Sequence, residues 1–213
     1  PHITSHKSNE TPLRIWVPGC STGEEVYSIA ISLLEFLGDQ ANHLPIQLFG
    51  SDIKESCIQA ARAGIYPENI SRAVSVERLK QYFNKVDRGY QIAKSIRDRC
   101  IFAKQNVTAD PPFSRIDLIS CRNLLIYLNP ILQKKVIPTF HYALNPDGFL
   151  LLGQSETVMG FQDLFKCVNQ KAKIYSKKLA QAQQIFGPVD TPPYVPERFS
   201  VSKLNEKTEA FRI

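Results

Sequence analysis

The segment 13–38 constrains the fold of this chain more than any other stretch, because a strand pattern, a tight turn and a helix pattern follow one another directly. Residues 13–17 (LRIWV) form a β-type run that ends in a Pro-Gly pair. From Glu24 to Leu37 the apolar residues recur at i, i+3, i+4 and i+7, which predicts a helix, and a glycine follows as its stop. A strand leading through a glycine turn into a helix is typical of α/β proteins.

The alternation continues along the chain. Its further members are a strand at 46–50 that ends in Ser51-Asp52, a helix at 55–63 before Gly64, a strand at 116–121, and strands at 149–152 and 173–176. Between the strands at 116–121 and 149–152, a helix runs toward Leu144, with Asn129 as its expected N-cap and Pro130 at its first position. Pro138 lies inside the last helix and predicts a kink or a break there. Residues 145–148 (NPDG) predict a turn. Together these patterns predict a doubly wound α/β sheet.

Residues 66–104 interrupt this alternation. They contain a helix-like stretch, VERLKQYF (76–83), and two short β-type runs, GYQIA and RCIFAK, on either side of a polar segment. We interpret this region as an inserted helix and β-hairpin. The rest divides into an expected linker at 1–12, a main domain at 13–178 and a proline-containing tail or linker at 179–213.

Composition restricts the cellular setting and the kinds of site. The five cysteines are scattered without a C-x-x-C pair, which argues against disulfides and metal sites and favours the cytoplasm. No run approaches the roughly 18 apolar residues of a membrane span. The net charge of +6 suits an acidic protein partner or nucleic acid equally. Because the chain begins with Pro1, we expect it to be part of a longer protein.

The turn PGCSTGEE (18–25) has three possible interpretations. Residues 19–23 match the G-x-S-x-G nucleophile elbow of hydrolases, with Ser21 as the nucleophile. An elbow needs a later histidine on a loop, and the candidates are His43, before a strand, and His141, inside a predicted helix. Alternatively, Gly19 and Gly23 let the backbone approach a cofactor, or the turn simply joins strand to helix.

Asp52 favours the cofactor interpretation. It ends the second strand, where a carboxylate can accept both hydroxyls of a ribose. The glycine spacing does not match the dinucleotide fingerprint G-x-G-x-x-G. On its own, Asp52 could equally be a solvated strand end or a helix cap.

Six stretches, taken in order, resemble the CheR-type chemoreceptor methyltransferases. They are RIWVPGCSTGEEVYSIAI (14–31), GSDI (50–53), ARAGIY (61–66), QNV (105–107), ISCRNLLIYL (119–128) and LLGQSE (151–156). The family transfers a methyl group from S-adenosylmethionine to glutamate side chains of bacterial chemoreceptors and releases S-adenosylhomocysteine. The resemblance implies a seven-stranded, Rossmann-like methyltransferase sheet, with 66–104 as its small inserted β-subdomain.

The resemblance also implies roles for individual residues. The implied cofactor contacts are Gly19, Glu25, Asp52, Asn106, Val107, Arg122 and Asn123, with Asp52 on the ribose and Asn106-Val107 near the adenine. Either Glu24 or Glu25 fits the motif carboxylate, and we select Glu25. Tyr127 matches the tyrosine beside the transferred methyl, and Arg122 could pair with a carboxylate of the cofactor or the substrate.

The chain departs from the family pattern in places. Gln154 stands where a histidine is usual, and Leu128-Asn129 replaces a common Phe-Asp pair. The family's N-terminal helical domain, with its arginine-bearing Phe-Phe-Arg segment, is not in the sequence, so we expect part of the cofactor pocket to be missing. SET (155–157) and KAKIY (171–175) resemble versions fused into larger multidomain sensory proteins.

Methyl transfer to a glutamate side chain agrees with the lack of a catalytic triad or metal-binding motif in the sequence. A glutamate side chain, with an ordinary pKa of about 4.3, is already an anion at neutral pH and needs no general base. We expect an acidic, helical chemoreceptor segment as partner, with the basic residues of 66–104 as a candidate contact: Arg88, Lys94, Arg97 and Arg99. The alternatives are a non-catalytic cofactor-sensing or interaction module and a nucleic-acid methyltransferase. Against the latter, no N-P-P-Y-type motif lies within the sheet.

Overall fold

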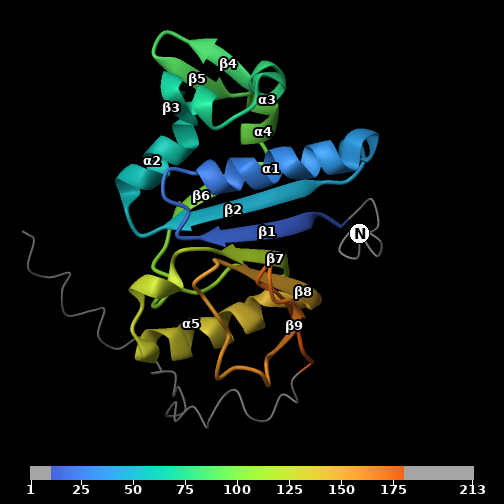
Figure 1. Cartoon of the computed structure of the whole chain (residues 1–213), viewed down its shortest axis with the longest axis vertical. Helices are drawn as coiled ribbons and strands as arrows, with labels where there is room; N and C mark the ends of the chain where they lie inside the picture. The colour runs from blue at the N-terminus through green and yellow to red at the C-terminus, as the bar shows by residue number, and fades with distance from the viewer. Residues whose placement is uncertain (1–10, 180–213) are drawn as a thin grey trace, which may run out of the picture. The chain divides into compact units, whose positions relative to one another are not determined.

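A seven-stranded sheet forms the centre of the computed structural model, which describes residues 11–179 (Figure 1). Its strands are β1 (Leu13–Pro18), β2 (Ile46–Asp52), β6 (Cys100–Lys104), β7 (Ile116–Cys121), β8 (Leu144–Leu152), β9 (Phe165–Asn169) and β10 (Ile174–Lys177), in the order β6-β2-β1-β7-β8-β10-β9. The first five strands of that order are parallel, whereas β10 runs antiparallel to both β8 and β9. This is the expected doubly wound sheet. At one edge it is extended by two antiparallel strands, β10 and β9.

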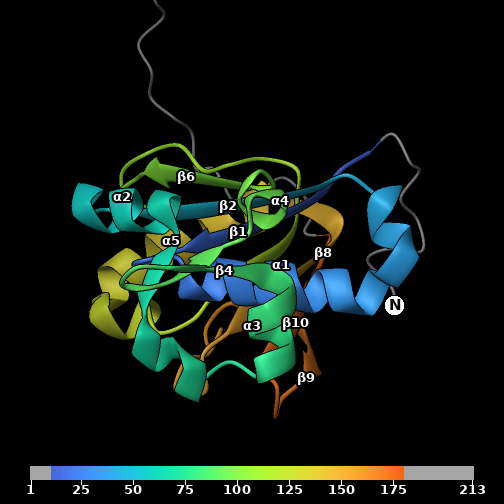
Figure 2. The ribbon, with the colours of Figure 1, turned by 90° about the horizontal axis from the view of Figure 1, so that it is seen from above.

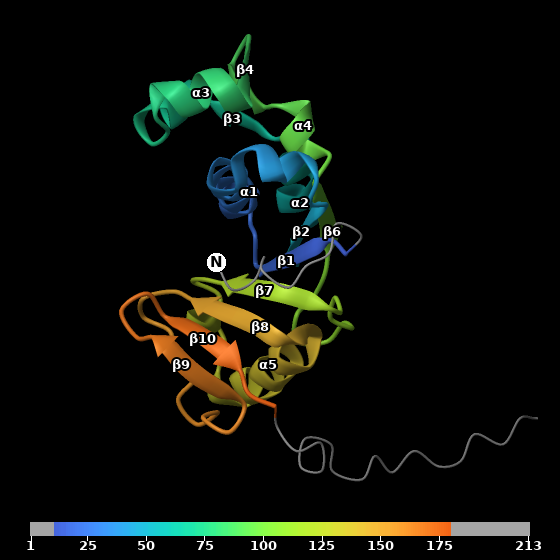
Figure 3. The ribbon, with the colours of Figure 1, turned by 90° about the vertical axis from the view of Figure 1, so that its right-hand side faces the viewer.

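Helices cover both faces of the sheet (Figures 1 and 3). The helices outside the insertion are α1 (Glu24–Leu37), η1 (Gly38–Asn42), α2 (Glu55–Ala63), η3 (Leu125–Tyr127) and α5 (Pro130–Ala143). In β1, Ile15 and Val17 face the core formed with α1 and α2, and Trp16 faces the core formed with α5. This period of two, with apolar residues on both faces, is what a central parallel strand requires.

Trp16 fixes the core beneath α5. The side chain is fully buried, and its ring makes edge contacts with Phe113 and Phe140 at centroid distances of 5.5 Å each. Its indole Nε1–H donates to Ser51 Oγ at 2.9 Å, so burial leaves no unsatisfied donor. The same residue therefore joins the α5 core to the carboxyl end of β2.

The insertion between α2 and β6 is a second, three-stranded antiparallel sheet. Its elements are β3 (Ile65–Pro67), η2 (Glu68–Arg72), α3 (Val76–Tyr82), β4 (Phe83–Val86), β5 (Gly89–Ile92) and α4 (Lys94–Arg97), and the strand order is β3-β5-β4. The insertion lies over α1 (Figures 1 and 2), and Leu79, Phe83 and Ile92 belong to the same buried core as Tyr27 of α1. The small sheet is thus packed on the main domain.

Several local predictions are confirmed. The ranges of α1, α2, β1, β2 and β7 agree with the sequence patterns. Asn129 caps α5, since its Oδ1 accepts the Leu132 N–H at 2.9 Å, and Pro130 occupies the first turn. Of the kink or break expected at Pro138, the break does not occur, since α5 runs from Pro130 to Ala143 with Pro138 inside it.

Other predictions are wrong. RCIFAK does not belong to the hairpin: Cys100–Lys104 is β6, which pairs parallel with β2 at the edge of the main sheet, while the hairpin joins β4 to β5. The expected turn at 145–148 is the irregular first half of β8, where the pairing with β7 jumps from Ile116–Leu144 to Leu118–Phe149. Strand β9 was not predicted, because its residues after Phe165 are all exposed and show no alternation. The expected linker and tail lie almost wholly outside the described residues.

The close packing of Gly23 can be tested with a matched pair of glycines. Gly23 and Gly160 have similar φ values, +92° and +87°, but a Cβ on Gly23 would lie 2.9 Å from Ala61 Cβ, whereas one on Gly160 would meet nothing within 4 Å. Gly160→Ala should therefore lower the free energy of unfolding only by the cost of holding alanine in the left-handed conformation, about 1–2 kcal/mol. Gly23→Ala should cost roughly 1–3 kcal/mol more, because α2 must move. Urea unfolding measures both, and equal destabilisation would contradict the packing argument.

Candidate cofactor site

The sheet order creates a crevice at the carboxyl end of β1. From β1 the chain proceeds through α1 to β2 on one side, whereas β7 pairs with β1 on the other side. The connections after β1 and β7 therefore leave in opposite directions. Such a switch point is where ligands bind in open α/β sheets.

The turn after β1 is held by three neighbours. Cys20 N–H donates to Ser51 O at 2.9 Å, and Ser21 N–H donates to Asp52 Oδ2 at 3.0 Å. From the small sheet, the Tyr66 hydroxyl donates to Thr22 O at 2.9 Å. The turn is thus fixed by the end of β2 and by the insertion together.

The structure does not support the nucleophile elbow. Ser21 offers its backbone N–H to a carboxylate, and φ is +48°. His141 is buried in α5, where its ring nitrogen Nε2 lies 2.9 Å from Lys178 O and burial lowers its pKa. His43 lies in the connection between η1 and β2. No hydrogen bond between Ser21 and either histidine occurs among the described residues.

Gly19 and Gly23 make room for protein atoms. A Cβ on Gly19 would lie 3.0 Å from Leu124 Cδ1, and the Cβ of a residue at position 23 would meet Ala61. The turn thus needs glycine to pack against α2 and against the loop after β7. The expected approach of the Gly19 backbone to a cofactor stays a prediction.

Asp52 retains acceptor capacity for a ligand. Its Oδ2 accepts Ser21 N–H and its Oδ1 accepts Lys54 N–H at 2.9 Å, whereas a carboxylate has about four acceptor positions. The Gln105 N–H donates to Asp52 O at 2.9 Å, which brings residues 105–107 beside it. A diol such as that of ribose fits the remaining positions.

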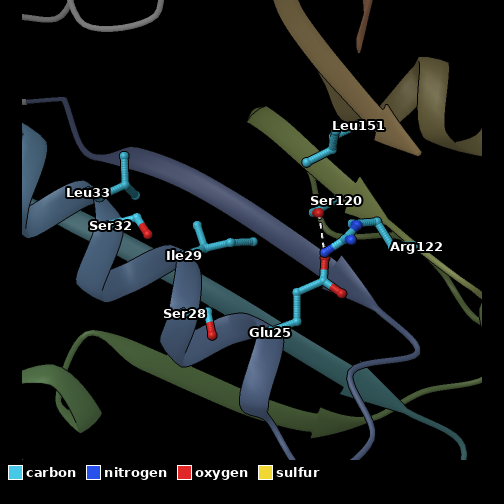
Figure 4. Close-up of a pocket in the computed structure, with 8 residues that line it drawn as sticks. All are labelled: Glu25, Ser28, Ile29, Ser32, Leu33, Ser120, Arg122 and Leu151. Atoms are coloured by element: carbon cyan, nitrogen blue, oxygen red, sulfur yellow. Dashed lines mark hydrogen bonds between the residues drawn. The ribbon is translucent and has the colours of Figure 1, made fainter. Parts of the chain in front are cut away.

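Glu25 lies on the other side of the α1 N-terminus, in a cavity of about 330 Å³. The cavity is lined by Glu25, Ser28, Ile29, Ser32, Leu33, Ser120, Arg122 and Leu151 (Figure 4). The buried Ser120 hydroxyl donates to Glu25 Oε1 at 2.6 Å, and the Arg122 guanidinium points toward the same carboxylate. The lining residues come from α1, from the end of β7 and from β8. Glu25 at the start of α1 and Ser120 and Arg122 at the carboxyl end of β7 place one end of the cavity at the switch point.

The environment of Glu25 disfavours its charge. Burial raises the pKa of the carboxyl group above its ordinary value of about 4.5. The Ser120 hydrogen bond and the Arg122 charge act in the opposite direction, and the negative charge of Glu156 adds to the increase. A cationic ligand group in the cavity would relieve this cost.

These two groups of residues fit S-adenosylmethionine. The molecule carries a ribose diol, an ammonium, a sulfonium and a carboxylate. Asp52 suits the diol, Glu25 suits a cation, and Arg122 suits a carboxylate. The other predicted site residues, which lie outside these two groups, are Asn106, Val107, Asn123 and Tyr127.

Asn106 and Val107 follow β6. The Asn106 Oδ1 accepts both the backbone N–H and the hydroxyl of Thr108, at 3.0 and 2.7 Å, so this side chain shapes its own loop. Val107 packs against the core beneath α5. Their backbone follows Gln105, whose N–H donates to Asp52 O, and their expected place near the adenine stays a prediction.

Asn123 and Tyr127 belong to the loop after β7. Asn123 has φ of +59°, and its N–H donates to Glu156 Oε2 at 3.0 Å. The Tyr127 side chain is 80% exposed in η3 and does not line the cavity. Its expected place beside a methyl group stays a prediction.

Sequence reasoning missed two residues. Ser120 lies in the motif ISCRN and Glu156 in LLGQSE, yet neither was selected as a site residue. A serine in an otherwise apolar strand, and an acid directly after one, were the available signals. Their hydrogen-bond partners lie far away in the sequence, so these signals do not predict what either side chain binds.

Two kinds of feature do not occur within residues 11–179. Within that range, no three His, Cys, Asp or Glu residues gather as metal ligands. Within the same range, no helix is long and apolar enough to cross a membrane.

The raised pKa of Glu25 predicts a pH-dependent effect of Glu25→Gln. A carboxyl group whose pKa is higher in the folded chain binds protons more tightly there, so its contribution to stability is present below about pH 4.5 and is lost as the pH rises through its folded-state pKa. Glutamine keeps an acceptor for Ser120 but does not titrate. The free energy of unfolding of the variant, relative to wild type, should therefore increase from pH 4 to pH 8.

Urea unfolding across this range measures the difference. Glu24→Gln, in the same helical turn but exposed, controls for the loss of one charge near the helix N-terminus. If the change in the free energy of unfolding caused by Glu25→Gln is constant with pH, or follows that of Glu24→Gln, the pKa of Glu25 is not raised by folding.

Comparisons with known proteins place this chain in a family. The family model "CheR methyltransferase, SAM binding domain" matches residues 1–174. A chemotaxis protein methyltransferase of Vibrio parahaemolyticus is 35% identical over 165 residues, which cover 76% of this chain and 60% of the relative. One from Borreliella burgdorferi is 35% identical over 162 residues, covering 74% of this chain and 56% of the relative.

A larger relative shows the same region in another setting. An uncharacterized 104.1 kDa protein of Rhodobacter capsulatus is 34% identical over 163 residues, covering 76% of this chain but 17% of that protein. The chain thus spans at most about 60% of the length of these curated relatives. The sheet order, the small inserted sheet and the family match lead to one conclusion: this chain belongs to the CheR methyltransferases and contains their S-adenosylmethionine-binding domain.

Proposed function

We propose that this chain is the catalytic domain of an S-adenosylmethionine-dependent protein-glutamate O-methyltransferase that modifies chemoreceptors in the cytoplasm. The observation that carries the proposal is the meeting of Glu25, Ser120 and Arg122 in a cavity at the switch point, beside the turn held by Asp52. S-adenosylmethionine, when bound, supplies a methyl group on a sulfonium, and S-adenosylhomocysteine is the product. Family membership supports this chemistry.

Each side chain has a proposed task. Asp52 holds the ribose, and the backbone of Asn106-Val107 borders the adenine. Glu25 attracts the cationic end of the cofactor, and Arg122 with Asn123 holds a carboxylate group. Tyr127, being exposed, is free to meet an incoming protein and to orient the acceptor oxygen.

The acceptor glutamate needs positioning more than activation. Its carboxylate is already ionised at neutral pH, with an ordinary pKa of about 4.3. Holding two reacting groups in contact can supply effective molarities of roughly 10⁵ M or more. The domain therefore acts by binding, orienting and excluding water, and none of its side chains has to remove a proton.

The proposed partner is an acidic helical segment of a chemoreceptor, and nucleic acid is not the proposed substrate. In the small sheet and its flanks, Arg88 and Lys94 are exposed, although Lys94 also pairs with Asp98 at 2.7 Å. Arg97 and Arg99 are half-buried. The overall charge of +6 supports an acidic partner.

Cofactor binding gives the first test. By isothermal titration calorimetry with S-adenosylhomocysteine, Asp52→Ala should weaken binding by about tenfold or more, since a charge-assisted hydrogen bond contributes roughly 1.5–3 kcal/mol. Ser21→Ala should leave the Kd nearly unchanged, because the residue contributes its backbone N–H. The titration is done with this chain and with a longer protein that includes upstream sequence. If neither binds, the enzymatic proposal is wrong and a non-catalytic module remains.

Methyl transfer identifies the acceptor. With radiolabelled S-adenosylmethionine, label should pass to chemoreceptor cytoplasmic fragments and not to DNA or RNA, and base should release it, as expected of a glutamyl methyl ester. Tyr127→Phe and Arg122→Ala should slow the transfer at saturating cofactor. Base-stable label, or preferential labelling of nucleic acid, would overturn the proposed substrate.

A further inference from the structure

Glu156 is a buried carboxylate in the connection between β8 and β9. Its side chain is only 4% exposed, and its two oxygens accept three backbone N–H groups. Leu125 N–H donates to Oε1 at 2.7 Å, while Gly153 and Asn123 N–H donate to Oε2 at 2.7 and 3.0 Å. These bonds replace the water that a buried carboxylate loses.

The three donors come from two separate loops. Asn123 and Leu125 follow β7, and Gly153 follows β8, so one side chain ties together the carboxyl ends of two parallel strands. A Cβ on Gly153 would lie 2.6 Å from Glu156 Oε2 and 3.0 Å from Asn123 Oδ1. Glycine is needed here because the loops approach so closely.

The loop after β7, which supplies two of these three N–H donors, also contains Arg122 and Tyr127, which have proposed roles in methyl transfer. Asn123 and Leu125 flank Leu124, whose side chain packs against Gly19 in the turn after β1. Tyr127 N–H then donates to Leu124 O at 3.1 Å. A fixed backbone at 123–125 therefore determines how Arg122, Tyr127 and the Gly19 turn lie relative to one another.

The chemistry of the site explains why this residue is an acid. All three partners are N–H donors, so only a group that accepts at both ends satisfies them. Glutamine has the same shape but would turn an NH₂ toward at least one N–H. Aspartate keeps the charge but is one methylene shorter. Hydrogen bonds to a charged acceptor are also stronger than neutral ones.

We propose that Glu156 is a positioning residue that fixes the segment 122–127 in the geometry needed for cofactor binding and methyl transfer. Its relevance to methyl transfer rests on the proposed function. The fixing of the segment itself stands on the three hydrogen bonds.

Three variants of the 213-residue chain test this. Glu156→Gln changes the chemistry at constant shape, and Glu156→Asp keeps the charge. Asp163→Asn makes the matched acid-to-amide change at an exposed position of the same β8–β9 connection. Amide hydrogen exchange by NMR reports on segment 122–127, calorimetry gives the Kd for S-adenosylhomocysteine, and methyl-transfer assays give kcat and KM.

We expect Glu156→Gln to remain folded, with exchange at Asn123, Leu125 and Gly153 faster by about tenfold or more while amides of β1 and β2 stay protected. The Kd should rise and kcat should fall by about tenfold, with Glu156→Asp intermediate and Asp163→Asn equal to wild type. If Glu156→Gln fails to fold, Glu156→Asp carries the same comparison with the control.

Two results would overturn the inference. One is wild-type exchange in segment 122–127 of the Glu156 variants. The other is faster exchange with unchanged Kd and kcat, which would reduce the carboxylate to a structural role. If neither the wild-type chain nor a longer protein that includes upstream sequence transfers a methyl group, the proposed function fails, but the exchange and Kd measurements still decide whether Glu156 positions the segment.

Discussion

Strand β1 pairs in parallel on both of its edges, with β2 on one side and β7 on the other. A parallel neighbour can be reached only through a crossover, so α1 must return the chain to β2, and β7 must come from the far side. Both faces of β1 are then covered, which explains its apolar residues in Ile15, Trp16 and Val17 alike. The same pairing brings the carboxyl ends of three strands together, and the cofactor site follows from that meeting.

Two carboxylates hold this edge of the sheet in place by accepting N–H groups. Asp52 binds the turn after β1, and Glu156 binds the loops after β7 and β8. A third, Glu25, accepts only the Ser120 hydroxyl among the hydrogen bonds of the described residues and carries a raised pKa from burial. Glu156 thus supports the site, whereas Asp52 supports it and, like Glu25, keeps acceptor capacity for a ligand.

Local patterns predicted the elements whose periodicity is strong. The helix Glu24–Leu37 and the cap at Asn129 were read directly, because a 3.6-residue period and a capping side chain act over a few residues. The patterns failed where tertiary pairing decides. Cys100–Lys104 looks like a hairpin strand but pairs with β2, and Phe165–Asn169 is a strand only because β10 lies beside it.

Local patterns in the sequence were sufficient for most of the strands and helices, for the glycine turn after the first strand, and for a set of motifs specific enough to indicate the family. Which of those motif residues meet depends on the three-dimensional fold. The Glu25–Ser120 bond joins positions 95 residues apart, and two of the three donors to Glu156 lie 31 and 33 residues before it. No local period records such contacts, because they arise from the order in which the strands are paired in the sheet.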